Sequence, residues 1–143
     1  MSIKHTQEIT CPECEAVQPA TIWTTVNVTL EPEMRDVTMD RRLNVFCCEK
    51  CGQMASLDVS VMYHDMTRNY AIQYINLKDM KSENYYKNIR HDGTLALPSL
   101  VNEMVKKAGG GDYLFRPHIV FSMNEMICYI VFRDLCEAWG TEK

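Results

Sequence analysis

Two cysteine pairs constrain the fold of this chain more than any other feature. Each pair has C-x-x-C spacing, which places two thiols on one tight turn; the pairs are Cys11 with Cys14 and Cys48 with Cys51. Zinc accepts four thiolates in a closed tetrahedron, so two such turns separated by a hairpin predict a zinc ribbon. A closed shell leaves no position for a metal-bound water, so the predicted ion is structural and does not activate water.

Two alternatives concern the same thiols. They could be free or redox-active, but a redox C-x-x-C usually opens a helix in a βαβ unit, and neither pair is in that context. Cys47 adjoins Cys48 and could replace it as a ligand. The glycine at Gly52 favours Cys48, because C-x-x-C-G spacing suits a turn whose amides point at sulfur.

Composition and charge limit the class of protein to which this chain can belong. The chain has 143 residues, of which 46% are hydrophobic, so a single domain with a buried core is expected. The net charge is −4, and the acidic excess lies in residues 1–77, with 6 basic and 10 acidic groups. A nucleic-acid-binding ribbon would favour Lys and Arg in that half, so this balance argues against one.

The seven cysteines indicate a reducing compartment. Four are predicted metal thiolates, and Cys47, Cys128 and Cys136 fall inside apolar patterns. Residues 1–10 are polar and lack the apolar segment of a secretory signal, and no run is long enough to span a bilayer. We therefore expect a cytoplasmic protein.

The first half of the chain reads mainly as strands. Residues 17–30 predict a strand with Ile22, Val26, Val28 and Leu30 on one face, and Pro32 then starts a short helix or turn. Residues 43–47 predict a short strand that delivers the second cysteine pair. Strict alternation over residues 55–63 predicts one half-buried antiparallel strand, with residues 70–77 returning as its partner.

The second half is more helical. Ser82 is expected to cap a short helix through Ile89, and residues 100–108 predict a helix that Gly109 terminates. Pro117 restricts a strand within residues 113–121 to an edge position. Ser122 and Glu125 form a capping box, which predicts a last helix running to about Trp139.

These elements predict an α+β fold: an antiparallel sheet containing a zinc ribbon, with a C-terminal helix packed on it. We expect a single domain over residues 1–143, with the ribbon and sheet in 1–78, a helical segment in 79–111, and the edge strand and last helix in 112–143. The last helix is apolar over much of its circumference. One of its faces is expected to pack on the 100–108 helix, which we favour, or on a second copy of the chain; that face carries Cys128, Phe132, Cys136 and Trp139.

The chain resembles the CpXC family of bacterial and archaeal proteins, named for two C-P-x-C motifs. The resemblance covers most of the chain and rests on both cysteine pairs, the Tyr63-His64-Asp65 segment, and the Ser-x-Asn-Glu helix start at residues 122–125. It implies a zinc-ribbon-like domain and no particular activity. Glu49 stands where the second proline is expected, and Glu15 where a glycine often follows the first pair. Proline is not a ligand, but Glu15 replaces the residue that most easily adopts positive φ.

Two polar groups are candidates for other sites. His64 beside Asp65 at a strand end could be a base or a metal ligand, although the same residues also suit an ordinary turn. A second group could stack on and bind single-stranded nucleic acid, or could be a solvated helix face and a charged turn. Its members are Tyr85, Tyr86, Lys87, Arg90, Arg41 and Arg42.

The expected function is a zinc-stabilised binding or adaptor protein that acts through protein–protein contacts, as a monomer or a homodimer. A nucleic-acid-binding ribbon is the alternative, and an enzyme with a site near His64 and Asp65 is the third. No catalytic activity is expected, because no nucleotide-binding loop or nucleophile elbow is present.

Overall fold

The computed structural model describes residues 2–96, 99–107 and 111–140. The predicted helix end at Ala108 and the glycine at Gly109 lie outside the described residues, as do the side chains of Tyr85, Leu100 and Val101. The elements in chain order are β1 Ile3–Thr10, β2 Val17–Asn27, α1 Glu33–Met39, β3 Val45–Cys47, β4 Met54–Ser56, β5 Val61–Asp65, β6 Tyr70–Tyr74, α2 Leu77–Met80, α3 Glu83–Tyr86, α4 Ser99–Lys107, the 3-10 helix η1 Asp112–Phe115, β7 His118–Val120 and α5 Met123–Ala138.

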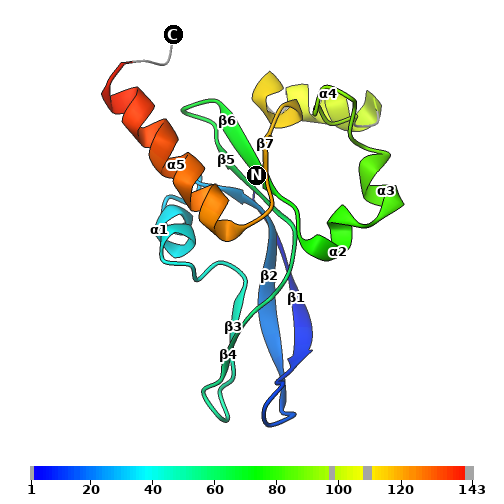
Figure 1. The fold of residues 1–143 in the computed structure, drawn as a ribbon, viewed down its shortest axis with the longest axis vertical. Helices are drawn as coiled ribbons and strands as arrows, with labels where there is room; N and C mark the ends of the chain where they lie inside the picture. The colour runs from blue at the N-terminus through cyan, green and yellow to red at the C-terminus, as the bar shows by residue number, and fades with distance from the viewer. Residues whose placement is uncertain (1, 97–98, 108–110, 141–143) are drawn as a thin grey trace.

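The described strands form a main sheet of order β1-β2-β5-β6-β7 and a separate β3-β4 hairpin. This confirms the α+β class and the C-terminal helix. The sheet is mixed, because β1 with β2 and β5 with β6 pair antiparallel, whereas β2 with β5 and β6 with β7 pair parallel. Figure 1 shows the β3-β4 hairpin beside the lower end of the β1-β2 hairpin, with α1 and α5 on one side and α2 to α4 on the other. As predicted, β7 lies at an edge.

The single strand predicted over residues 55–63 is wrong. Its first residues belong to β4 in the hairpin, and its last belong to β5 in the main sheet. Bonds from distant residues separate the two parts: the amide of Leu57 donates to the carbonyl of Asn44, and the side-chain amide of Asn76 donates to the carbonyl of Asp58. The alternation is therefore real, but it spans two sheets.

Strand β1 is not predicted from the sequence. Its eight residues are exposed except for the half-buried Ile9, so it carries little of the apolar signal that marks a strand. It pairs with β2 from Lys4 opposite Trp23 to Thr10 opposite Val17. The polarity of residues 1–10 thus reflects an exposed edge strand.

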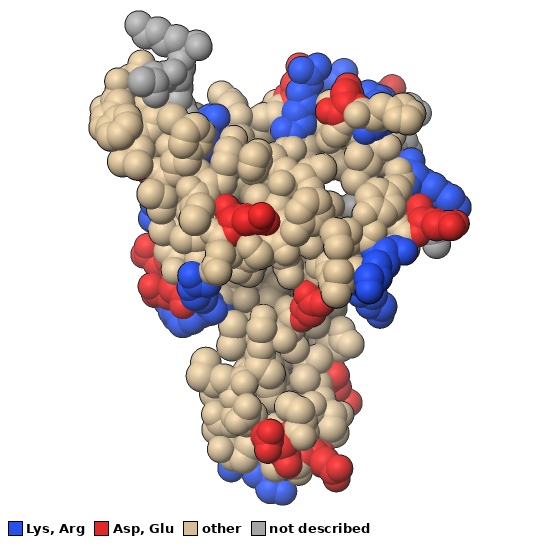
Figure 2. All heavy atoms as spheres, in the orientation of Figure 1, with Lys and Arg blue, Asp and Glu red and all other residues tan. Residues whose placement is uncertain are grey.

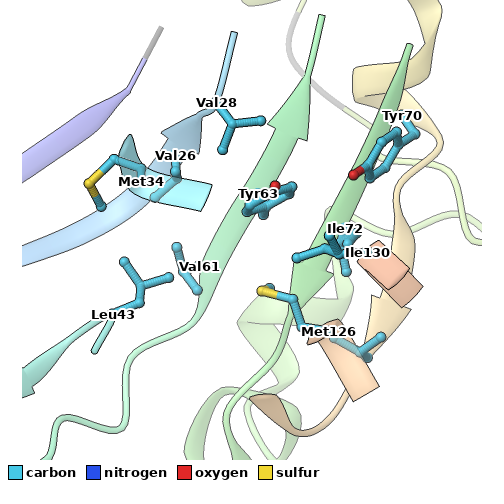
Figure 3. Close-up of a cluster of buried hydrophobic side chains, with 11 residues drawn as sticks. Val26, Val28, Met34, Leu43, Val61, Tyr63, Tyr70, Ile72, Met126 and Ile130 are labelled. Carbon is cyan, nitrogen blue, oxygen red and sulfur yellow. The ribbon is translucent and has the colours of Figure 1, made fainter. Parts of the chain in front are cut away.

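The main core lies between the sheet and helices α1 and α5 (Figure 3). Met126 and Ile130 of α5 are fully buried, and they lie close to Tyr63 and Ile72 of the central strands. Val26 of β2 and Val28, which directly follows the strand, are buried as predicted, whereas Leu30 lies further beyond the strand and is 64% exposed. The packing of α5 on the sheet therefore depends mainly on Met126 and Ile130, and the half-buried Met123 and Tyr129 pack against the same core.

Helix α5 begins at the predicted cap. The hydroxyl of Ser122 accepts the amide of Glu125 at 3.1 Å, and the carboxylate of Glu125 accepts the amide of Phe121 at 2.6 Å. The carboxylate thus reaches the residue before the cap and not the cap amide itself, as it would in the usual capping box. The start of the helix is fixed by these two bonds.

The favoured packing of α5 on the helix at residues 100–108 is wrong. Phe132 is 55% exposed and Trp139 is 72% exposed, so the face that carries them is not covered within the described chain. Figure 1 shows why: α4 lies on the other side of β7 from α5. The second alternative, packing on another copy of the chain, stays a prediction.

The core predicts the effect of truncating α5. Ile130→Ala should lower the free energy of unfolding by about 2–5 kcal/mol, because it opens a cavity where the side chain is fully buried. The neighbouring Val131→Ala is the matched control and should cost less than about 1 kcal/mol, because Val131 is 40% exposed. Urea denaturation followed by circular dichroism measures both values. Equal losses would contradict this assignment of the buried face.

Candidate metal centre

The four predicted cysteines meet at one point. The sulfurs of Cys11, Cys14, Cys48 and Cys51 all lie within 4.8 Å of one another. The Sγ atoms of Cys11 and Cys51 are 3.6 Å apart, as are those of Cys14 and Cys48. Metal–sulfur bonds of about 2.3 Å at tetrahedral angles require sulfurs about 3.8 Å apart, so this cluster fits a four-coordinate metal ion.

The two turns have the same backbone design. In the first, the amide of Cys11 donates to Ala16 and that of Glu15 donates to Cys11; in the second, Cys48 donates to Gln53 and Gly52 donates to Cys48. The fourth position after each first cysteine adopts positive φ, +59° at Glu15 and +76° at Gly52. Glu15 therefore takes the conformation that glycine adopts most easily, and the first turn closes without a glycine.

Backbone amides point at the sulfurs, as expected for such turns. Hydrogen bonds from the amides of Cys51 and Lys50 lower the pKa of Cys48 to about 6. At Cys51 the amide of Gln53 lowers the pKa, but desolvation of the sulfur inside the cluster and its contacts with the neighbouring sulfurs outweigh it and raise the value to about 12. The opposite pKa shifts of Cys48 and Cys51 reflect the mutual contact of the sulfurs, and a divalent cation would favour the thiolate form in which cysteine binds metal.

The cluster is the centre of a small hydrophobic cluster of its own. Cys11, Cys48 and Phe46 are each 1% exposed, whereas Cys51 is exposed. Half-buried residues pack around them, namely Ile9, Cys14, Ala16, Ala20, Ala55 and Leu57. Two of the three fully buried members are cysteines, so this end of the molecule has almost no core besides the candidate metal site.

Cys47 lies outside the cluster. Its side chain is exposed, and its carbonyl accepts the side-chain amide of Gln18 at 2.9 Å. The carbonyl of the same Gln18 side chain accepts the amide of Glu49 at 2.8 Å, which joins the second turn to β2. The structure therefore brings Cys48, and not Cys47, to the other three thiols.

His64 and Asp65 are incorporated into the structure around the β5-β6 turn. His64 is 3% exposed, and its Nδ1 lies 3.1 Å from the hydroxyl of Tyr113. One oxygen of Asp65 accepts the amides of Thr67 and Arg68 and the hydroxyl of Thr29. This arrangement matches the turn alternative, in which the carboxylate organises the chain reversal.

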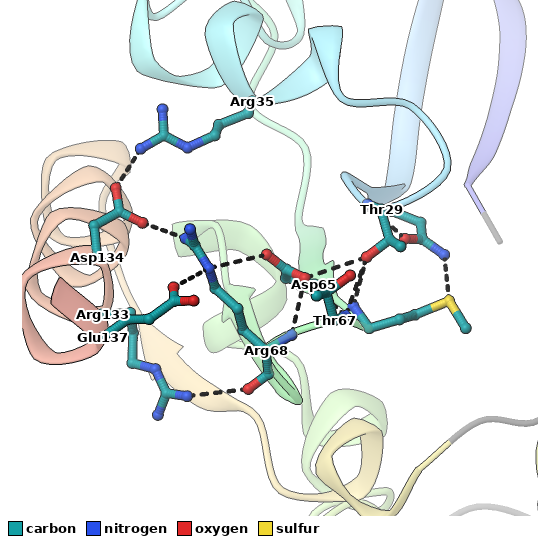
Figure 4. Close-up of polar contacts among 10 residues, drawn as sticks. Thr29, Arg35, Asp65, Thr67, Arg68, Arg133, Asp134 and Glu137 are labelled. Atoms are coloured by element: carbon teal, nitrogen blue, oxygen red, sulfur yellow. Dashed lines mark hydrogen bonds and ion pairs between the residues drawn. The ribbon is translucent and has the colours of Figure 1, made fainter. Parts of the chain in front are cut away.

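Arg68 connects that turn to α5, which the sequence reading missed (Figure 4). Its guanidinium pairs with Asp134 and Glu137 of α5 and lies 3.9 Å from Asp65. Asp134 also pairs with Arg35 of α1, so one carboxylate joins two helices and the turn. Burial lowers the pKa of Arg68, but these carboxylates outweigh it and raise the value. No local motif signals the contacts with α5, because Arg68 and Arg35 are 66 and 99 residues from Asp134 in the chain.

The candidate nucleic-acid group is divided by the fold. Arg41 and Arg42 follow α1, whereas Tyr86, Lys87 and Arg90 belong to α3 or follow it, on the other side of the sheet in Figure 1. Arg42 pairs with Asp40 at 3.1 Å, and Arg41 donates to the side chain of Asn124. Figure 2 shows Lys and Arg interspersed with Asp and Glu on the face in view. The structure therefore does not join these residues into one basic surface.

Among the helices of the described ranges, none combines the length and the apolar character that a bilayer crossing requires.

The position of Cys48 predicts a contrast with its neighbour. Cys48→Ser should lose at least most of the bound metal, because its sulfur belongs to the cluster, whereas Cys47→Ser should retain about one ion per chain. Elemental analysis of the purified variants measures both. Equal metal content in the two variants would contradict the assignment.

Comparison with known proteins places the whole arrangement in a family. A search of curated proteins and a search of solved structures each found no match. A family model described as "CpXC protein" matches residues 9–134, which include both cysteine pairs, strands β2 to β7 and most of α5, but only the end of β1. The chain therefore belongs to the CpXC family.

Proposed function

We propose that this protein is a zinc-stabilised binding protein of the cytoplasm that acts as an adaptor through protein–protein contacts. The observation that carries the proposal is an apolar seam on α5, made of Cys128, Phe132, Leu135 and Trp139. Three of these residues, Cys128, Phe132 and Trp139, belong to the face that the sequence predicts to be covered, and Leu135 replaces Cys136. Along the chain, successive seam residues are four, three and four positions apart. That spacing is typical of a helix that packs lengthwise against another helix.

The seam is exposed, and its last residue, Trp139, directly follows the end of α5. Phe132, Leu135 and Trp139 are 55%, 43% and 72% exposed, and Cys128 is also exposed. A shallow hollow beside the start of the seam lies between β7 and α5 and includes His118, Glu125 and Tyr129. The rings of His118 and Tyr129 stack there, with centroids 3.9 Å apart. An exposed apolar surface of this kind marks an interaction site, and its shape suits an amphipathic helix of the partner.

The opposite face of α5 is held rigidly. Met126 and Ile130 are buried in the core, and Asp134 pairs with Arg35 and Arg68. The seam is therefore presented by a fixed helix, so little conformational entropy is lost when a partner binds.

We assign zinc to the four-cysteine cluster. Four thiolates in a closed tetrahedron are the usual zinc shell of structural sites, although iron accepts the same ligands. Ligation in such sites contributes about 10 kcal/mol or more to folding. Because the hydrophobic cluster around Cys11, Phe46 and Cys48 is separate from the main core, the metal is expected to stabilise the ribbon end first.

Removal of the metal should unfold one end of the molecule only. Chelation should remove hydrogen-exchange protection from β3, β4 and the cysteine turns, while β5, β6 and α5 keep theirs, because the main core contains none of the four cysteines. Exchange measured by mass spectrometry with and without chelator tests this, and elemental analysis of the untreated protein should give one zinc per chain. Unchanged protection at the cysteine turns, with the metal removed, would show that the metal is peripheral.

The seam should account for partner capture. Immobilised protein should retain a protein other than itself from native lysate, and Phe132→Glu should reduce that retention at least about tenfold, because it places a charge in the apolar contact. Leu77→Glu is the matched control: Leu77 is 56% exposed at the start of α2, on the other side of the sheet. The retained protein is identified by mass spectrometry and its affinity is measured with purified components.

The two variants separate the outcomes. Loss of binding in Phe132→Glu with retention in Leu77→Glu supports the proposal. Equal binding by the wild type and Phe132→Glu would exclude the seam as the contact surface. Both variants should keep the melting temperature and metal content of the wild type, since both positions are exposed.

A further inference from the structure

Strand β1 forms the outer edge of the main sheet. It is eight residues long and pairs with β2 on one side only, and no strand of the described residues pairs with its other side. In Figure 1 no helix is drawn beside the lower half of β1. Such an edge presents a row of backbone donors and acceptors, which proteins usually protect or use for pairing.

The register of β1 with β2 shows which backbone groups point outward. The amide of Cys11 donates to the carbonyl of Ala16, so that pair is hydrogen-bonded, and bonded pairs alternate along an antiparallel ladder. The odd residues His5, Gln7 and Ile9 therefore bond to β2. The amides and carbonyls of the even residues point away from β2; these residues are Lys4, Thr6, Glu8 and Thr10.

Pro19 agrees with this assignment. It lies in β2 directly opposite Glu8, at a position that makes no hydrogen bond to β1. Proline has no amide proton, so a ladder tolerates it only at such a position.

We propose that β1 pairs antiparallel with β1 of a second copy of this chain, with Thr6 opposite Thr6 and the two main sheets joined into one. This surface is distinct from the α5 seam, and the proposal does not rest on the function proposed above. The outward groups of Lys4, Thr6 and Glu8 would make the hydrogen bonds to the same three residues of the second copy.

The charges of β1 select this register. With Thr6 at the centre, Lys4 lies opposite Glu8 of the second copy, and Glu8 opposite its Lys4. The register also places Ile3 opposite Ile9 on the other face of the sheet. Oppositely charged and apolar cross-strand pairs each stabilise an antiparallel ladder.

Other registers lack this complementarity. Centring on Lys4 or Glu8 places like charges directly opposite, which is unfavourable. Centring on His5 or Gln7 leaves each charge opposite a hydroxyl-bearing residue. A strand that matches itself in only one register is suited to a symmetric dimer, in which each copy contributes the same surface.

Lys4 lies on β1 beside β2, and its side chain must turn outward to reach Glu8 of the second copy. Its ammonium lies 4.7 Å from the centre of the Trp23 ring, on the face of the sheet that Thr6 and Glu8 share with it. A strand pair covers less area than the roughly 1,200 Å² of a stable interface. We therefore expect a weak dimer, whose population rises with protein concentration and falls with added salt.

Sedimentation velocity over a concentration series tests the proposal. The wild type should shift from monomer towards dimer as concentration rises. Lys4→Glu and Glu8→Lys should each weaken dimerisation about tenfold or more, because both oppositely charged contacts become like-charge contacts at once. The double variant Lys4→Glu/Glu8→Lys should restore it, since each charge again meets its opposite.

Mixing the two single variants adds a test of register. An equimolar mixture of Lys4→Glu and Glu8→Lys should form a heterodimer that neither forms alone with comparable affinity, because one chain then carries two acids and the other two bases. Failure of both the double variant and the mixture to restore dimerisation would overturn the proposed register.

Controls separate β1 from other surfaces. Thr6→Pro should abolish the dimer and leave the monomer folded, because position 6 makes no bond to β2, and melting temperature and metal content verify the fold. Phe132→Glu should leave the dimer unchanged. A wild type that stays monomeric at every concentration overturns the proposal, as does a dimer that Phe132→Glu dissociates and Lys4→Glu does not.

Discussion

The continuity of β2 holds the two halves of the molecule together. Its first residues pair with β1 beside the cysteine cluster, and its last residues pair parallel with β5 in the main core. Between them, the backbone of Trp23 exchanges two hydrogen bonds with the side chain of Asn44, at 2.8 and 2.9 Å. The buried side chain of Asn44, which is 7% exposed, thus supplies the hydrogen bonds that a neighbouring strand would make at this point of β2. An apolar residue there would leave two backbone groups of Trp23 without these partners.

The sequence allowed prediction of those features whose cause is local. The thiol spacing, the serine cap of α5 and the proline before β7 each act within a few residues, and each is in the structure as expected. The break within residues 55–63 could not be predicted, because it depends on bonds from Asn44 and Asn76. The pairing of Arg68 with Asp134 is hidden for the same reason, since neither residue has a local pattern that identifies its partner.

The sequence correctly indicates that α5 has more apolar surface than the sheet can cover. It does not indicate what covers the remainder, and the predicted helix at residues 100–108 does not. Periodicity shows how many faces of a helix are apolar and not which surface covers them. Met126 and Ile130 bury one face of α5 in the core, and the ion pair of Arg68 with Asp134 fixes the orientation of the helix. The seam at Phe132 and Trp139 therefore remains exposed to solvent. An exposed apolar seam opposite a buried face is the geometry from which we propose a binding partner.

The metal site and the edge of β1 are physically linked. Glu8 is three residues before Cys11, and Ile9 packs on the hydrophobic cluster around the four thiols. A metal bound by the four thiols would therefore keep β1 ordered at the end where the proposed pairing needs Glu8 in place. Any ligand that binds only the ordered form stabilises it by mass action, and such coupling is reciprocal. A second copy paired along β1 would therefore tighten metal binding by the same factor by which the metal favours pairing.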